Sequence, residues 1–234
     1  MKTIDLIGNP APQPDIESWV QGHEPLLNEL TGQVVLIEVI QVNCPGCFVH
    51  ALPETIRLHE TYSSQGLKVF AIATAFEHFE HNTLNNLERL LQHGELIGDP
   101  LFQLDKADFL VDKKLPYSIP FSVAMDKLIE NDCEASEEEI NQFILSQIPD
   151  FFSGSLNNER ARAKRQIPLG CKQLIYQQAE SYLKSKAYNA LTFEMYQLQG
   201  TPSTIVIDKK GILRQVAFGA VNKLETTIQQ LLSE

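Results

Sequence analysis

VVLIEVIQVNCPGCF, residues 34–48, joins an almost continuous apolar run to two cysteines three positions apart, Cys44 and Cys47. The run is rich in β-branched residues, which is typical of a strand buried on both faces of a sheet. Residues 45–63 continue at helical spacing, and Pro53 is expected to kink that helix. The two cysteines therefore stand at the junction of a buried strand and a helix.

Outward from this junction, the sequence predicts an alternation of strands and helices. The expected elements are a helical turn at 26–30, strands at 67–75, 119–125, 203–207 and 213–218, and helices at 83–93 and 221–233. The last two strands flank Gly211 and are expected to form a hairpin. Strand–helix alternation implies parallel strands with helices on the sheet faces, so we expect an α/β fold.

Residues 127–189 differ in character from the rest. Residues 128–150 hold seven acidic side chains and no Lys or Arg, and a long helical pattern runs from Lys172 to Gln197. Ser136 and Glu139 have the spacing of a capping box at a helix start. We expect a helical insertion at 127–189 within a domain formed by 1–126 and 190–234.

Composition excludes several classes of protein. The 234 residues are 43% hydrophobic and carry a formal net charge of −11, which argues against nucleic-acid binding. No run approaches the ~18 apolar residues of a membrane span, and no secretory h-region is present, so we expect no membrane association and a cytoplasmic location. No Gly-rich phosphate loop follows a strand, so no organic cofactor is expected.

The order of elements, with Cys44-Pro45-Gly46-Cys47 at a helix start and Gly200-Thr201-Pro202 before a terminal hairpin, resembles the thioredoxin fold. It is most similar to thioredoxin-like proteins of the TlpA and redoxin (peroxiredoxin-related) group. The resemblance covers roughly residues 20–126 and 190–234. It implies a central sheet flanked by helices, with the insertion placed before a cis-proline segment.

The resemblance also implies site residues. Cys44 and Cys47 stand where these families hold their redox pair, and Glu38 where thioredoxins hold a buried acid. Thr201 and Pro202 stand where they hold a cis-proline beside the disulfide. The sequence departs from thioredoxins at Asn43, where they usually have Trp, and in its central Pro-Gly in place of Gly-Pro.

The expected activity is thiol–disulfide exchange. Backbone N–H groups at a helix start favour a thiolate at Cys44, which would attack a substrate disulfide. Cys47, one turn further on, would resolve the mixed disulfide after losing its proton to Glu38. Residues expected to contact substrate are Pro45, Gly46, His78, Thr201 and Pro202. The expected partners are protein or small-molecule disulfides and thiols and a redox partner.

Other interpretations stay open. A thiol peroxidase is the nearest, although neither cysteine has the Pro-x-x-x-Thr-x-x-Cys set of peroxiredoxins. A zinc or copper site would combine Cys44 and Cys47 with His50 or with the pair His78 and His81, but we favour no metal. A third interpretation is a scaffold without the chemistry.

Residues of the insertion raise two further questions. Cys133 and Cys171 are interpreted as reduced thiols without a shared role. Phe151 and Phe152 suggest an apolar contact, with a homodimer as one option. The substrate, the electron donor and the direction of electron flow are not fixed by the sequence.

Overall fold

The computed structural model describes residues 6–23, 25–131, 134–148 and 169–234. By their contacts the residues divide into two compact units. One unit comprises the described residues among 6–129 and 190–234, and the other comprises those among 130–189.

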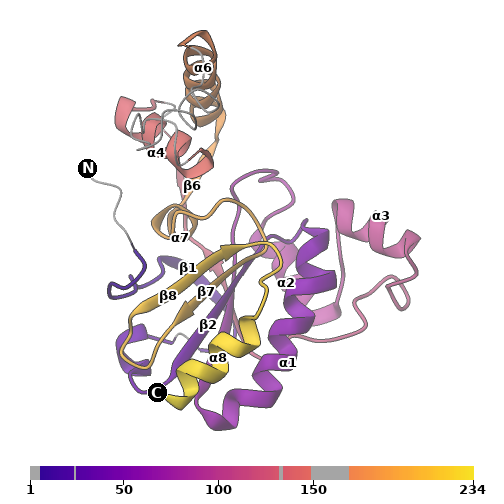
Figure 1. Ribbon diagram of the computed structural model, residues 1–234. Coiled ribbons are helices and arrows are strands. Elements are labelled where there is room, and N and C mark those ends of the chain that lie inside the picture. The colour runs from indigo at the N-terminus through magenta and orange to yellow at the C-terminus, as the bar shows by residue number, and fades with distance from the viewer. Residues whose placement is uncertain (1–5, 24, 132–133, 149–168) are drawn as a thin grey trace, which may run out of the picture. The chain divides into compact units, whose positions relative to one another are not determined.

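The larger unit is built on a six-stranded sheet in the order β1-β4-β3-β2-β7-β8 (Figure 1). Its strands are β1 Ile16–Gln21, β2 Val34–Ile40, β3 Leu67–Ala73, β4 Ser122–Asp126, β7 Ser203–Ile207 and β8 Leu213–Phe218. The three strands β2, β3 and β4 are parallel, whereas β1, β7 and β8 pair antiparallel to their neighbours. The sheet is therefore mixed, and β1 is a strand that the sequence analysis did not predict.

Strand β2 is buried over its whole length, as its apolar run predicts. Val34, Leu36 and Ile40 belong to one apolar core, and Val35, Ile37 and Val39 belong to a second. Successive side chains of a strand point to opposite faces, so these are the cores on the two faces of the sheet. Glu38 has the parity of Leu36 and Ile40, which places a carboxylate inside the first core.

Helices α1 Leu52–Tyr62 and α8 Leu224–Ser233 lie side by side on one face of the sheet (Figure 1). Arg57 of α1 pairs with Glu225 of α8 at 2.9 Å, and the Tyr62 hydroxyl donates to the same carboxylate at 2.8 Å. The π-helical turn η2 Cys47–Ala51 precedes α1, and Pro53 is among the first residues of α1. The expected break in this helix is thus a change from π to α geometry.

Two helices, α2 Leu84–His93 and α3 Gly98–Lys106, form an insertion between β3 and β4. The Thr83 hydroxyl caps α2 by accepting from Asn86 N, and Gly94 ends the helix in the left-handed region. The buried side chains of α2 are Leu87 and Leu90, whereas Leu84 is exposed. Helix α3 was not predicted from the sequence.

The shorter elements of the larger unit complete its outline. They are the 3-10 turns η1 Leu27–Leu30 and η3 Ser63–Gln65 and the short helix α7 Leu191–Met195. Strand β5 Leu128–Glu130 pairs with β6 Tyr188–Ala190 in a separate two-stranded sheet.

The smaller unit contains α4 Glu137–Gln147 and α6 Leu169–Ser185. Ser136 and Glu139 form the predicted capping box, and Ile140, Ile144 and Ala179 make a small apolar core between the helices. Cys171 is exposed and free. Cys133, Phe151 and Phe152 lie outside the described residues.

The helix predicted from Lys172 to Gln197 was wrong beyond Ser185. The chain forms β6 and then begins the separate helix α7. Asp126, at the end of β4, accepts from the backbone N–H groups of Thr192 and Phe193 at 2.9 and 3.2 Å. These bonds start a new helix, because they supply acceptors that the preceding turn would otherwise provide. No helix within the described part of the chain has the length and apolar character needed to cross a membrane.

Candidate active site

Cys44 and Cys47 lie just beyond the carboxyl end of β2, at the start of the helical segment. Pro45 occupies the first helical position, where its missing N–H leaves no bond unmade. The Cys47 backbone N–H donates to Cys44 Sγ at 3.3 Å, and the Cys47 thiol also hydrogen-bonds that sulfur. Cys44 is partly exposed and Cys47 is fully buried. The sulfur of Cys44 is thus accessible, and the sulfur of Cys47 lies buried next to it.

The two thiols differ in acidity because of this arrangement. The hydrogen bond from the Cys47 thiol is the largest influence on Cys44 and, with backbone N–H groups of Cys47 and Gly46, it lowers the pKa of Cys44 to about 7 against the effect of burial. Burial raises the pKa of Cys47 well above its ordinary value, and the bond that it donates to Cys44 raises it further. Near neutral pH, Cys44 is therefore the sulfur that ionises.

Glu38 lies in the core beside the cysteines and is 1% exposed. The hydroxyls of Thr55 and Thr204 donate to its Oε2 at 3.3 and 3.0 Å, while Oε1 has no partner among the described residues. Burial raises the pKa of Glu38 to about 8 despite these two bonds. The carboxyl interacts electrostatically with both Cys44 and Cys47. A carboxyl that exchanges its proton near pH 8 therefore stands close to the buried thiol.

The loop before β7 reaches the same place from the other end of the chain. The Thr201–Pro202 peptide bond is cis, as the resemblance predicts. Thr201 O lies 3.5 Å from Cys44 Sγ. A Cβ atom built on Gly46 would lie 3.7 Å from Pro202 Cδ, so the proline ring packs against the turn between the cysteines. The fold thus gathers Cys44, Gly46, Thr201 and Pro202.

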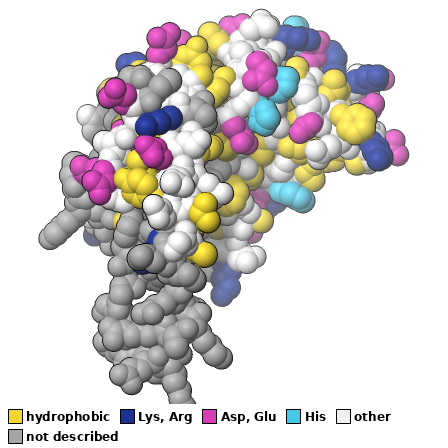
Figure 2. Space-filling view, turned by 90° about the horizontal axis from the view of Figure 1, so that it is seen from above, with side chains coloured by type: hydrophobic (Ala, Val, Ile, Leu, Met, Phe, Trp, Pro, Cys, Tyr) yellow, Lys and Arg dark blue, Asp and Glu magenta, His cyan; other side chains and the backbone are white. Residues whose placement is uncertain are grey.

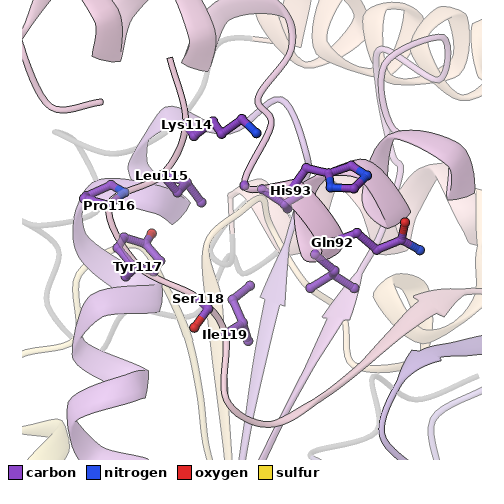
Figure 3. A pocket seen from close by; sticks show the side chains of 11 residues that line it. Gln92, His93, Lys114, Leu115, Pro116, Tyr117, Ser118 and Ile119 are labelled. Carbon is purple, nitrogen blue, oxygen red and sulfur yellow. The ribbon is translucent and has the colours of Figure 1, made fainter. Parts of the chain in front are cut away.

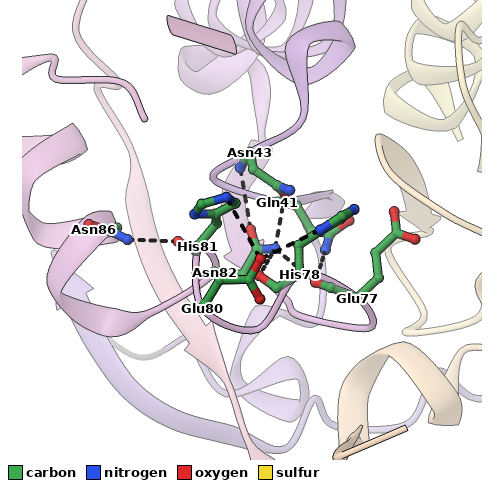
Figure 4. Close-up of polar contacts among 8 residues, drawn as sticks. All are labelled: Gln41, Asn43, Glu77, His78, Glu80, His81, Asn82 and Asn86. Atoms are coloured by element: carbon green, nitrogen blue, oxygen red, sulfur yellow. Dashed lines mark hydrogen bonds and ion pairs between the residues drawn. The ribbon is translucent and has the colours of Figure 1, made fainter. Parts of the chain in front are cut away.

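A third segment, residues 77–82, is held beside the cysteines by amide side chains (Figure 4). Asn82 Nδ2 donates to Asn43 Oδ1 at 2.9 Å, and Asn82 Oδ1 accepts from Asn43 N at 3.3 Å. Asn82 also donates to the carbonyls of Glu77 and His78 at 3.0 and 3.2 Å. Because Asn43 directly precedes Cys44, this reciprocal pair fixes the segment against the site.

The imidazole of His78 is more than half exposed and pairs with Glu80 at 3.6 Å. Its backbone has φ 49°, in the left-handed region, where histidine is one of the few non-glycine residues found more often than average. The side chain of His81 pairs with the same carboxylate at 3.7 Å. The structure therefore places His78 on the segment beside the cysteines, with its side chain engaged by Glu80.

Sequence reasoning missed several residues of this site, among them Gln41, Thr55, Asn82, Tyr117 and Thr204. Gln41 is 2% exposed and is followed by the loop that carries Cys44. A polar residue within an apolar run marks Glu38, and the same criterion would have identified Gln41. Thr55, Asn82 and Thr204 carry no comparable local signal, because their partners lie far away in the sequence.

Tyr117 reaches the cysteine turn from the loop ahead of β4. Its hydroxyl donates to Phe48 O at 2.6 Å, and its pKa is raised by burial and by the nearby Cys47. It also lines a pocket between the end of α2 and residues 114–119, with a volume of about 570 Å³ (Figure 3). This open pocket shares Tyr117 with the cysteine turn.

Possible metal-binding side chains of the described residues do not form a cluster. Within residues 6–23, 25–131, 134–148 and 169–234, no three His, Cys, Asp or Glu side chains are placed to hold one. On the face seen in Figure 2, acidic, basic and histidine side chains of the described residues are interspersed with apolar ones.

Comparison with solved structures identifies the fold. A crystal structure of a thioredoxin-like superfamily protein is 23% identical, with a TM-score of 0.56 and 97% of each chain covered. A thiol-disulfide isomerase from Corynebacterium glutamicum is 23% identical, with a TM-score of 0.53 over 95% of this chain and 97% of that one. A solution structure of a thioredoxin-like protein in the oxidized form is 12% identical, with a TM-score of 0.50 and 98% of each chain covered.

No family model matches the sequence, and no curated protein is significantly similar to it. The likeness is thus one of structure at low identity. The chain has the thioredoxin-like fold: a mixed sheet flanked by helices, with α2 and α3 inserted between β3 and β4 and a Cys-x-x-Cys pair at a helix start.

Proposed function

We propose that this protein is a thiol–disulfide oxidoreductase that works through Cys44 and Cys47. One observation carries the proposal: an accessible sulfur with a lowered pKa accepts a hydrogen bond from the backbone N–H of a second, buried cysteine at 3.3 Å. The thiolate is the nucleophile of disulfide exchange, and its partner must lie within reach to close the bridge. The name of the Corynebacterium glutamicum structure, a thiol-disulfide isomerase, supports the same chemistry.

In the reducing direction, the Cys44 thiolate attacks one sulfur of a substrate disulfide. The substrate S–S bond breaks, a mixed disulfide forms, and the leaving thiolate takes a proton from water. Cys47 then loses its proton and attacks Cys44 Sγ, which releases the second substrate thiolate and leaves a Cys44–Cys47 disulfide. A dithiol donor reduces that disulfide by the same steps in reverse order.

Glu38 is the proposed proton acceptor for Cys47. Its buried carboxyl has a raised pKa and an unpartnered Oε1, so it can take a proton that the buried thiol cannot readily give to bulk water. The bonds from Thr55 and Thr204 hold Oε2, which leaves Oε1 as the oxygen available for this transfer.

Substrate would lie across the exposed face of Cys44. Pro45, Gly46, Thr201 and Pro202 would form its floor, and His78 one side. An extended polypeptide fits this role, because the backbone of the cis-proline loop lies next to the sulfur. We therefore expect protein disulfides to be better substrates than small disulfides. A redox partner would restore the dithiol, and the expected location is a reducing compartment such as the cytoplasm.

The test is a trapping experiment with a peptide disulfide. Cys47→Ser should accumulate a covalent mixed disulfide at Cys44, while Cys44→Ser should form none and lose turnover. Cys171→Ser serves as the matched control and should behave as the wild type. Turnover that survives Cys44→Ser would overturn the proposal. A redox titration then gives the direction: a potential near about −270 mV indicates a reductase, and one near about −120 mV an oxidant.

A further inference from the structure

The buried side chain and backbone of Gln41 connect three parts of the site. Gln41 follows β2 and is buried, and its backbone O accepts from Cys44 N at 3.1 Å. The Thr201 hydroxyl donates to Gln41 Oε1 at 3.0 Å, and Gln41 Nε2 donates to Glu77 O at 3.1 Å. Figure 4 shows this side chain beside the segment at residues 77–82.

The chemistry of the partners fixes the orientation of the Gln41 amide. A backbone carbonyl only accepts hydrogen bonds, so Glu77 O must face the Gln41 NH₂ group and not its oxygen. Asn82 Nδ2 also donates to Glu77 O at 3.0 Å, which holds that carbonyl in place. Gln41 Oε1 therefore faces Thr201, and the only proton available for that contact is the one on the Thr201 hydroxyl.

Thr201 stands next to the reactive sulfur as well. Its carbonyl lies 3.5 Å from Cys44 Sγ, and its hydroxyl would lower the pKa of Cys44 if it donated its proton to that sulfur, although the bond that the hydroxyl makes is to Gln41 Oε1. A hydroxyl has a single proton and two lone pairs. Gln41 Oε1 and a Cys44 thiolate would thus compete for one donor.

We propose that Gln41 is a positioning residue whose side-chain oxygen holds the Thr201 hydroxyl proton away from the Cys44 sulfur. The hydroxyl then turns lone pairs, not its proton, toward the sulfur. The thiolate loses one charge-assisted bond, and it becomes more basic and a stronger nucleophile. The inference rests on the proposed function only in taking Cys44 as the nucleophile.

Other groups also influence Cys44. Cys47 and Glu38 are the titratable groups that interact with it from the helix start and from β2. The adjacent segment carries Glu77, His78, Glu80 and His81. None of these is changed in the variants below, so their influence is common to all of them.

The test measures the ionisation of Cys44 from the pH dependence of its alkylation by iodoacetamide, followed by mass spectrometry of the peptide that contains Cys44. Gln41→Met keeps the length of the side chain and removes the oxygen. It should free the hydroxyl to donate to the thiolate, and so raise the acid dissociation constant of Cys44 roughly tenfold. In the double variant with Thr201→Val this effect should vanish.

Thr201→Val alone keeps the inference falsifiable even if Gln41→Met does not fold. With Gln41 holding the proton, loss of the hydroxyl should change the acid dissociation constant of Cys44 by less than about twofold, and Thr201→Ser should match the wild type. A clear rise in the pKa of Cys44 in Thr201→Val would overturn the inference. So would an effect of Gln41→Met that persists in the double variant. Alkylation needs no turnover, so failure here is distinct from failure of the trapping experiment.

Discussion

Thr204 faces Glu38 directly across the pairing of β2 with β7, and its hydroxyl donates to Glu38 Oε2 at 3.0 Å. Thr55 donates to the same oxygen from α1. A strand and a helix thus supply donors to one buried carboxylate, yet the other oxygen stays without a partner among the described residues. Burying this acid lowers the stability of the folded protein. Such buried acids with shifted pKa values are found most often at functional sites.

The raised pKa of Glu38 predicts how stability depends on pH. The unfolded chain releases this proton near pH 4.5 and the folded protein near pH 8, so the folded state binds more protons between these values. The stabilisation is therefore full below about pH 4.5 and is lost as pH rises toward 8, with a slope of up to about 1.4 kcal/mol per pH unit. Glu38→Gln should remove this slope.

Urea denaturation of the wild type and Glu38→Gln at several pH values between 5 and 9 checks this prediction. The variant should be more stable than the wild type at pH 8 to 9, because it buries no charge. Glu29→Gln, which changes an exposed acid, is the control and should keep the slope of the wild type. Equal slopes in wild type and Glu38→Gln would show that Glu38 ionises normally.

The hydrogen bond from the Cys47 thiol predicts the ionisation of Cys44 in two matched variants. Cys47→Ala removes the donor and should raise the pKa of Cys44 from about 7. Cys47→Ser keeps an O–H donor at the same position and should leave the pKa of Cys44 closer to the wild-type value. Thiolate absorbance between pH 5 and 10 measures both. Identical titrations of Cys44 in the two variants would mean that the bond has no effect.

Much of the fold follows from local pattern, and the exceptions have physical causes. Strand β2 and the β7–β8 hairpin were predicted because their burial and turn residues are local properties of the sequence. Strand β1 was not predicted because its side chains are only partly buried or exposed, so it lacks the apolar run that marks β2. The end of α6 was missed because Asp126, at the distant end of β4, starts α7.

The same distinction holds for the site. The Cys-x-x-Cys motif and Gly200-Thr201-Pro202 are visible in the sequence, and Glu38 stands out within an apolar run. Thr55 and Asn82 look like ordinary helix and loop residues, and only the fold brings them to Glu38 and Asn43. Sequence therefore indicates the candidate reactive groups more readily than the residues that orient them.

Tyr117 is predicted to stabilise the π turn that begins with Cys47. In π geometry the carbonyl of Phe48 would accept from residue 53, but Pro53 has no N–H. The Tyr117 hydroxyl takes the place of that donor at 2.6 Å. Tyr117→Phe leaves the carbonyl without this bond and should lower the free energy of unfolding by about 1–3 kcal/mol.

A double-mutant cycle with Pro53→Ala separates this role from simple packing. Alanine restores an N–H at position 53, so the cost of Tyr117→Phe in the Pro53→Ala background should be clearly smaller than in the wild type. Denaturant unfolding of the four proteins measures the coupling. Strictly additive effects would mean that Tyr117 does not compensate for the proline.

Asn82 is predicted to hold the segment at residues 77–82 against Cys44. It is 1% exposed, and its amide donates to Asn43 and to two carbonyls of the segment. Asn82→Asp keeps the shape but replaces the NH₂ donors by a carboxylate oxygen that would face carbonyl oxygens. We expect faster amide exchange in residues 77–82 and a loss of about 2–4 kcal/mol in the free energy of unfolding.

Asn86→Asp is the matched control, because Asn86 makes a single side-chain bond to His81 O at the edge of the segment. This substitution should lower the free energy of unfolding by less than Asn82→Asp does. Hydrogen exchange read by mass spectrometry locates the change, and protection of residues 77–82 that is the same in both variants would contradict the role given to Asn82.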